Sequence, residues 1–156
     1  MAGINKHKII FLDFDGVLNS THYFENRHFR PDIDVNNTLD PKAGQLLQEL
    51  LDVDPAIKLV ISSAWRIRNS LDTLKMYLNE VGIDTSKVIG VTPVLNSNER
   101  GDDVQAWLDI HQDQVETFVI LDDDSDMAHL KDKLVQTDSA IGLTLNDIEK
   151  IREMLK

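Results

Sequence analysis

Residues 9–17, IIFLDFDGV, are the stretch of the sequence that indicates the fold most clearly. The apolar run is short and continuous, which is typical of a strand in a parallel sheet that is covered on both faces. Asp13 and Asp15 end it, and Gly16 follows them. Because extended backbone sends alternate side chains to the same side, we expect Asp13 and Asp15 to point in one direction and to share a small space.

Similar apolar runs recur and alternate with segments of helical periodicity. The predicted strands are residues 8–12, 58–61, 88–91, 118–121 and 134–136. Asp40 and Ser70 are expected to cap helices at their start, and Gly82 to end one. The alternation predicts a single α/β domain over residues 1–156, built as a three-layer, doubly wound, Rossmann-like parallel sheet of about five strands with a loop or flap at 19–39.

The composition limits the chemistry and the partners. The chain has 156 residues, 42% of them hydrophobic, which is enough for one globular core. It has no cysteine, so a metal would have to bind to oxygen or imidazole. A formal net charge of −11 weakens non-specific binding to nucleic acid. No stretch approaches the roughly 18 apolar residues of a membrane span, and residues 1–8 lack a signal region, so we expect a cytoplasmic chain without a membrane partner.

The predicted strands end in polar residues that are candidates for a site. Ligands of doubly wound sheets bind beyond the carboxyl ends of the strands. There the chain carries Asp13, Asp15, Ser62, Thr92 and the acidic run 122–126, DDDSD. Carboxylates brought close together raise one another's pKa unless a cation lies between them. Magnesium is the expected cation, because it prefers oxygen ligands and commonly bridges carboxylates to a substrate phosphate.

A purely structural interpretation of the acidic motifs stays open. Under it, Asp13 and Asp15 are solvated turn residues, and Asp124, Ser125 or Asp126 caps a helix that continues through Met127 and Leu130. We expect both interpretations to hold in part. Asp122 would then face the metal while a later member of the run caps the helix.

Four motifs in this order resemble those of the haloacid dehalogenase (HAD) superfamily. They are the opening signature at 9–17, the strand that ends in a hydroxyl at 59–62 (LVIS), Arg100 at the start of a helix, and residues 119–126 (VILDDDSD). The opening signature is the most specific of them, and together they span nearly the whole chain. The resemblance implies an HAD-like fold, and neither interval that holds a cap domain in many relatives is long enough for one here.

The resemblance implies a phosphatase, a hydrolase of phosphoric monoesters that works through an aspartyl-phosphate intermediate. Asp13 would be the nucleophile, and Asp15 would protonate the leaving oxygen and later take a proton from water. Ser62 would donate a hydrogen bond to the phosphate and Arg100 would offset its charge. Gly16 would let the backbone turn and approach the phosphate closely.

The resemblance also implies a ligand set for magnesium. The ligands would be Asp13, the backbone carbonyl of Asp15, and Asp122, with Asp123 or Asp126 in support. Asp122 is favoured within its run because it follows the strand directly.

The cation of the phosphate site is the least determined residue. Arg100 stands where the resemblance leads us to expect lysine, and Arg66 and Lys87 are alternatives. Under a structural interpretation, Arg100 is a surface cation paired with Asp102 or Asp103, and Ser62 is a turn or cap hydroxyl.

The absence of a cap implies an open site, which in this superfamily serves macromolecules or is closed by a partner subunit, as in a homodimer. The long connection at 20–38 interleaves aromatic and basic residues, namely His22, Tyr23, Phe24, Arg27, His28, Phe29 and Arg30. They either stack a base and hold a phosphate, or pack over the core.

Three functions follow, in order of preference. The first is a magnesium-dependent phosphatase of small phosphorylated molecules, and the second is a nucleic-acid end phosphatase that removes a 3′-phosphate. The second rests on a resemblance of residues 62–66 (SSAWR), 101–108 and 121–127 to uncapped HAD domains of RNA-repair and polynucleotide kinase-phosphatase proteins. The third is a non-catalytic module that binds magnesium and phosphorylated ligands, against which the retention of Asp15 argues.

Overall fold

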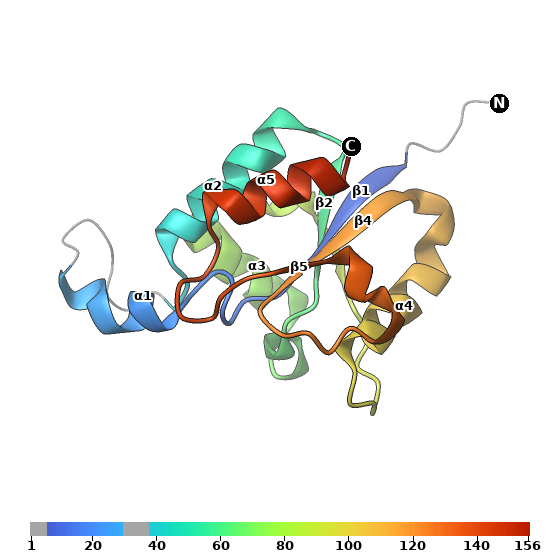
Figure 1. The fold of residues 1–156 in the computed structure, drawn as a ribbon, viewed down its shortest axis with the longest axis horizontal. Coiled ribbons are helices and arrows are strands. Elements are labelled where there is room, and N and C mark those ends of the chain that lie inside the picture. The colour runs from blue at the N-terminus through green and yellow to red at the C-terminus, as the bar shows by residue number, and fades with distance from the viewer. Residues whose placement is uncertain (1–5, 30–37) are drawn as a thin grey trace.

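A five-stranded parallel sheet forms the centre of the molecule (Figure 1). The computed structural model describes residues 6–29 and 38–156. The strands are β1 (His7–Leu12), β2 (Ile57–Ile61), β3 (Val88–Val91), β4 (Val115–Asp122) and β5 (Leu134–Gln136). Their order in the sheet is β3-β2-β1-β4-β5, and every neighbouring pair is parallel. Because the order reverses beside β1, the switch point of this doubly wound sheet lies between β1 and β4.

Helices cover both faces of the sheet and complete the three predicted layers. They are α1 (Thr21–Asn26), α2 (Pro41–Val53), α3 (Leu71–Glu80), α4 (Arg100–His111) and α5 (Leu145–Met154). Ile10 and Leu12 of β1 belong to the core shared with α2, α3 and α5, whereas Ile9 and Phe11 pack on the α4 side. This alternation explains why the strand reads as continuously apolar: both of its faces are buried.

The predicted helix ends are confirmed. Asp40 accepts a hydrogen bond from the amide of Lys42 at the start of α2, and Ser70 accepts one from Thr73 at the start of α3. Gly82 has a φ of +85° directly after α3, a conformation that glycine adopts without strain.

The structure corrects three of the predicted boundaries. β4 begins at Val115 rather than at 118, because residues 115–117 pair with the start of β1 although they lack a continuous apolar pattern. Part of the predicted loop at 19–39 is helical, since α1 is capped by Ser20, whose side chain accepts from the amide of Tyr23. The segment after β4 forms a 3₁₀ helix, Ala128–Lys133, and no acid of the run 122–126 caps it.

The aromatic and basic residues of that connection divide between core and surface. Tyr23 is buried, while Phe24 and Phe29 are exposed, and the guanidinium of Arg27 lies over the ring of Phe24 at 5.2 Å. Arg30 lies outside the described residues. Base stacking by this segment stays a prediction, as do the single-domain assignment, the homodimer and the cytoplasmic location.

No helix among residues 6–29 and 38–156 has both the length and the apolar character needed to cross a bilayer.

Candidate active site

Asp13, Ser62 and Asp122 lie side by side because they end three adjacent strands. Hydrogen bonding between the strands continues past their ends: the amide of Asp13 donates to the carbonyl of Leu121 (3.0 Å), and the amide of Ser62 donates to that of Leu12 (2.8 Å). Neighbouring strands lie about 4.8 Å apart. The sheet therefore brings the ends of the first, second and fourth predicted motifs together at its switch point.

A cluster of three carboxylates forms at this point. One oxygen each of Asp13, Asp122 and Asp123 lies within 4.8 Å of the others. Asp13 is 5% exposed and Asp122 is fully buried. Their remaining partners are local, since Asp13 accepts from the amide of Phe14 (2.8 Å) and Asp122 from that of Asp124 (2.9 Å).

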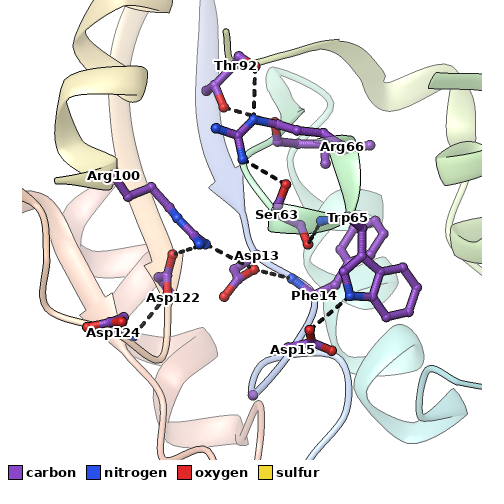
Figure 2. Close-up of polar contacts among 12 residues, drawn as sticks. Asp13, Phe14, Asp15, Ser63, Trp65, Arg66, Thr92, Arg100, Asp122 and Asp124 are labelled. Carbon is purple, nitrogen blue, oxygen red and sulfur yellow. Dashed lines mark hydrogen bonds and ion pairs between the residues drawn. The ribbon is translucent and has the colours of Figure 1, made fainter. Parts of the chain in front are cut away.

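Arg100 is the cation that faces the cluster. Its guanidinium lies 3.3 Å from Asp13 and 3.2 Å from Asp122. Figure 2 shows it directed toward both carboxylates. The start of α4 is held close to the segment after β4, because the amide of Gly101 donates to the carbonyl of Asp126 (3.1 Å). A side chain at Gly101 would collide with the backbone of Met127. Arg100 therefore pairs with the two strand-end acids and not, as the structural interpretation held, with an acid beside it in sequence.

Burial shifts the pKa values of the two strand-end acids, Asp13 and Asp122, because nearby positive charge and hydrogen bonds offset its effect only in part. Burial raises the pKa of Asp13 to about 9, helped by the neighbouring carboxylate of Asp122 and opposed by Arg100. Burial likewise raises the pKa of Asp122 to about 6, against the hydrogen bond from the amide of Asp124 and the charge of Arg100. Close carboxylates of this kind favour a cation between them.

The cluster fits a hard divalent cation. It offers carboxylate oxygens only, which magnesium prefers. Asp13, Asp122 and Asp123 are the side chains that could hold magnesium. Asp126, the other predicted supporting ligand, is not part of this cluster, although its charge acts on Arg100.

Asp15 does not share a space with Asp13 as the extended geometry predicted. Its carboxylate accepts hydrogen bonds from the indole of Trp65 (2.9 Å) and the amide group of Asn19 (3.0 Å), and Figure 2 shows it directed toward Trp65. The expectation was wrong because β1 ends at Leu12, so strand alternation no longer sets these directions. A role for Asp15 in proton transfer and as a backbone ligand stays a prediction.

Gly16 and Ser62 were predicted to contact the phosphate, and their surroundings in the structure differ. Gly16 has a φ of +80°, so the predicted turn is confirmed, but a Cβ there would collide with the carboxylate of Asp123. Its amide donates to Asn19 (2.9 Å). The hydroxyl of Ser62 is fully buried and has no hydrogen-bond partner within the described part of the chain. A buried polar atom of this kind calls for a ligand or another partner.

The other two candidate cations do not face the carboxylate cluster: Arg66 is bound by other groups of the protein, and Lys87 lies elsewhere. Arg66 donates to the carbonyls of Ser63 (2.8 Å), Thr92 (3.0 Å) and Pro93 (3.3 Å) and forms an ion pair with Asp103. Lys87 ends a 3₁₀ helix directly before β3, so it lies at the amino end of a strand. The carboxylate cluster lies at the carboxyl ends of the strands.

The sequence reasoning missed three residues that organise the site: Asn19, Trp65 and Asp103. Asn19 and Trp65 orient Asp15, and Asp103 holds Arg66. Trp65 and Asp103 lie inside the stretches 62–66 and 101–108 that were quoted for their resemblance, and Asn19 follows the opening signature by two residues, which was the available signal.

Comparisons with known proteins agree with this architecture. The family model described as the HAD domain in Swiss Army Knife RNA repair proteins matches residues 9–148. Among solved structures, the chain is similar to the HAD domain of effector protein Lem4 from Legionella pneumophila, with 20% identity and a TM-score of 0.58 over 97% of this chain and 95% of that one. An inactive mutant of that domain matches with 19% identity and a TM-score of 0.58 over 97% and 94% of the two chains. No curated protein sequence matches the chain. At these identities the likeness to Lem4 concerns the fold, and it confirms the predicted HAD-like fold.

Proposed function

We propose that this chain, which belongs to the family of HAD domains in Swiss Army Knife RNA repair proteins, is a magnesium-dependent phosphatase of phosphoric monoesters. The observation that carries the proposal is the meeting of Asp13, Asp122 and Asp123 with Arg100 at the switch point of the sheet. A structural ion pair would not need a third acid, nor a buried hydroxyl without a partner at Ser62.

The reaction would proceed in two displacements. A carboxylate oxygen of Asp13 attacks phosphorus while the ester P–O bond breaks, and the leaving oxygen takes a proton from Asp15. Water then attacks the phosphorus of the aspartyl-phosphate, its proton goes to Asp15, and inorganic phosphate leaves as the Asp13 carboxylate is restored. Trp65 and Asn19 orient Asp15 for both proton transfers.

Arg100 and Ser62 would offset the charge of the phosphoryl group. Arg100 is already beside Asp13 and would contact a phosphoryl oxygen there, and the hydroxyl of Ser62 would donate to another. When bound to Asp13, Asp122 and Asp123, magnesium supplies positive charge that offsets both the carboxylates and the phosphate. Burial raises the pKa of Asp13, and a cation at this place would oppose that rise.

A second candidate function is the removal of a terminal phosphate from a nucleic acid. The family to which the chain belongs is described by its occurrence in RNA repair proteins, and this description favours it. The same residues would act, and the two functions differ in the leaving group alone.

Asp13→Asn tests the proposed chemistry. We expect wild-type protein with Mg²⁺ to release phosphate from monoesters, and the variant to lose at least about a thousandfold in kcat, as nucleophile replacements do. EDTA should abolish release by the wild type. Phosphate release is followed with a colorimetric assay, and circular dichroism shows whether the variant is folded.

Two outcomes would contradict the phosphatase proposal. One is equal release by the wild type and Asp13→Asn. The other is tight binding of phosphorylated ligands by folded wild type without any turnover, which would favour a non-catalytic module.

A further inference from the structure

A cleft with a volume of about 180 Å³ adjoins the candidate active site. It lies between the 3₁₀ helix Ala64–Ile67 that follows β2, the connection after β3, and the first turn of α4. Arg100 lines this cleft and also faces Asp13. A monoester whose phosphorus meets Asp13 can therefore extend its leaving group into the cleft.

The residue proposed to protonate the leaving group is held by the same segment. Trp65 belongs to the 3₁₀ helix Ala64–Ile67 and donates to Asp15, while its neighbours Ala64, Arg66 and Ile67 line the cleft. The leaving oxygen has to lie near Asp15 when it takes the proton. The 3₁₀ helix that lines the cleft therefore also carries the residue that holds Asp15.

The cleft is built by buried interactions. Arg66, whose side chain is 4% exposed, joins the carbonyls of Ser63 and Thr92 to Asp103 of α4. Asp103 in turn accepts from the amide of Leu95 (3.0 Å). The walls are thereby fixed before a ligand arrives, which lowers the entropy lost on binding.

The lining includes apolar side chains that an uncharged ligand could contact. Ile67, Val94 and Leu95 are 60%, 52% and 42% exposed, so apolar surface is open to a ligand. Of the two arginines in the lining, Arg66 is paired with Asp103 and with backbone carbonyls, and Arg100 is directed toward Asp13 and Asp122, where it would meet the transferred phosphoryl group.

The acids of the lining disfavour a second anionic group. Three carboxylates, those of Glu99, Asp103 and Asp126, line the cleft against the two arginines. A carboxylate of this lining can accept a hydrogen bond from a hydroxyl group. A phosphate at this place would meet unfavourable charge, whereas a sugar hydroxyl would not.

We propose that this cleft is the leaving-group subsite and that it selects monoesters of small uncharged alcohols, such as a nucleoside monophosphate, over substrates with a neighbouring phosphate. This inference rests on the proposed phosphatase function. The cleft is smaller than the roughly 300 Å³ at which sites for drug-sized ligands begin, so it takes a sugar or a single ring and leaves the rest of the substrate outside.

Substrate comparison tests the selection. Phosphate release with Mg²⁺ is measured for glycerol 2-phosphate, adenosine 3′-monophosphate, adenosine 3′,5′-bisphosphate and a 3′-phosphorylated oligoribonucleotide. We expect kcat/KM for the monophosphate to exceed that for the bisphosphate and the oligonucleotide at least about tenfold, the equivalent of about 1.4 kcal/mol. Glu99→Gln, which removes a charge but keeps an acceptor, should narrow the gap to the bisphosphate.

Variants of the apolar wall test the cleft itself. In Ile67→Asn and Val94→Asn we expect the ratio of kcat/KM for adenosine 3′-monophosphate to that for glycerol 2-phosphate to fall about tenfold, as apolar contact is lost. Ile110→Asn is the matched control, because Ile110 is 71% exposed on α4 and does not line the cleft, so the ratio should not change.

The outcomes distinguish a failure of the leaving-group subsite from a failure of the phosphatase function. Equal or higher kcat/KM for the bisphosphate or the oligonucleotide, or an unchanged ratio in both wall variants, overturns the leaving-group subsite while the phosphatase function stands. No release from any of the four compounds overturns the proposed function, and this inference with it.

Discussion

Arg66 and Arg100 stand near the same edge of the sheet, yet their surroundings differ. Arg66 makes four hydrogen bonds, to three backbone carbonyls and to Asp103, and its side chain is 4% exposed. Arg100 has two longer contacts, at 3.2 and 3.3 Å, with acids that repel one another, and its side chain is 21% exposed. Arg66 is thus saturated by the protein, whereas Arg100 keeps donors for a ligand.

The two guanidinium groups also differ in the direction of their pKa shifts. Burial lowers the pKa of Arg66, and the attraction of Asp103 does not fully offset it. Burial acts on Arg100 in the same direction, but the charges of Asp13 and Asp122 outweigh it and raise the pKa. Hydrogen-bond saturation and the balance of nearby acids therefore separate a cation that holds the fold from one that faces a reactive site.

The largest effect is expected at Arg66, on stability. Arg66→Met leaves Asp103 buried without its cation, and the free energy of unfolding should fall by about 3–5 kcal/mol. Arg66→Lys should restore little, because lysine cannot reach the same carbonyls with a planar fork. Urea denaturation followed by circular dichroism measures the change.

A double variant checks the cause of that loss. Arg66→Met with Asp103→Leu removes both charges, and it should recover most of the stability lost in the single variant. If Arg66→Met alone were as stable as the wild type, the contrast between the two arginines would fail.

The next effect is expected at Arg100, on activity. Arg100→Met should lower kcat/KM for phosphate release by about a hundredfold or more, the loss that follows removal of one charge-stabilising donor. Its unfolding free energy should change less than that of Arg66→Met, since no backbone carbonyl of the described residues accepts from the Arg100 side chain. Arg100→Lys should keep part of the activity, because a point charge still offsets the phosphate. A full retention of activity in Arg100→Met would assign the phosphate-site cation elsewhere.

The smallest effect concerns pH and the metal-free protein. The pKa of Asp13 is raised by burial to about 9, so the folded state binds a proton that the unfolded state releases near its ordinary value of 3.8. Stability of the metal-free protein therefore falls as the pH rises between these two values, because the unfolded state binds fewer protons there. Asp13→Asn removes the penalty, so its melting temperature in EDTA should exceed that of the wild type by a few degrees at about pH 8 and match it more closely at about pH 4.

Magnesium provides the matching control. It should raise the melting temperature of the wild type at about pH 8 and affect Asp13→Asn less, because one carboxylate ligand is missing. Thermal scans with and without Mg²⁺ measure both shifts. An Asp13→Asn variant that melts below the wild type in EDTA at about pH 8 would contradict a cost of burying this carboxylate.

Much of the sheet could be predicted from the sequence, because continuous apolar runs record burial on both faces. The residues of β1 point alternately to the two halves of the core, and its neighbours repeat that pattern. The short helix α1 and the 3₁₀ helix Ala128–Lys133 were missed or misassigned, since neither carries a clear apolar period. Short segments of this kind are fixed by their packing rather than by their own sequence.

The order of residues along the chain already shows that acids end the first and fourth strands and that a hydroxyl ends the second. Parallel pairing then brings Asp13, Asp122 and Ser62 to one edge, because strand ends that carry such groups meet in any sheet of this order. Only the tertiary structure decided the partner of Asp15 and which arginine faces the acids. Those contacts join residues such as Asp15 and Trp65, which are 50 positions apart, and the approach of separate loops is set by the packing of the whole molecule and by no local pattern.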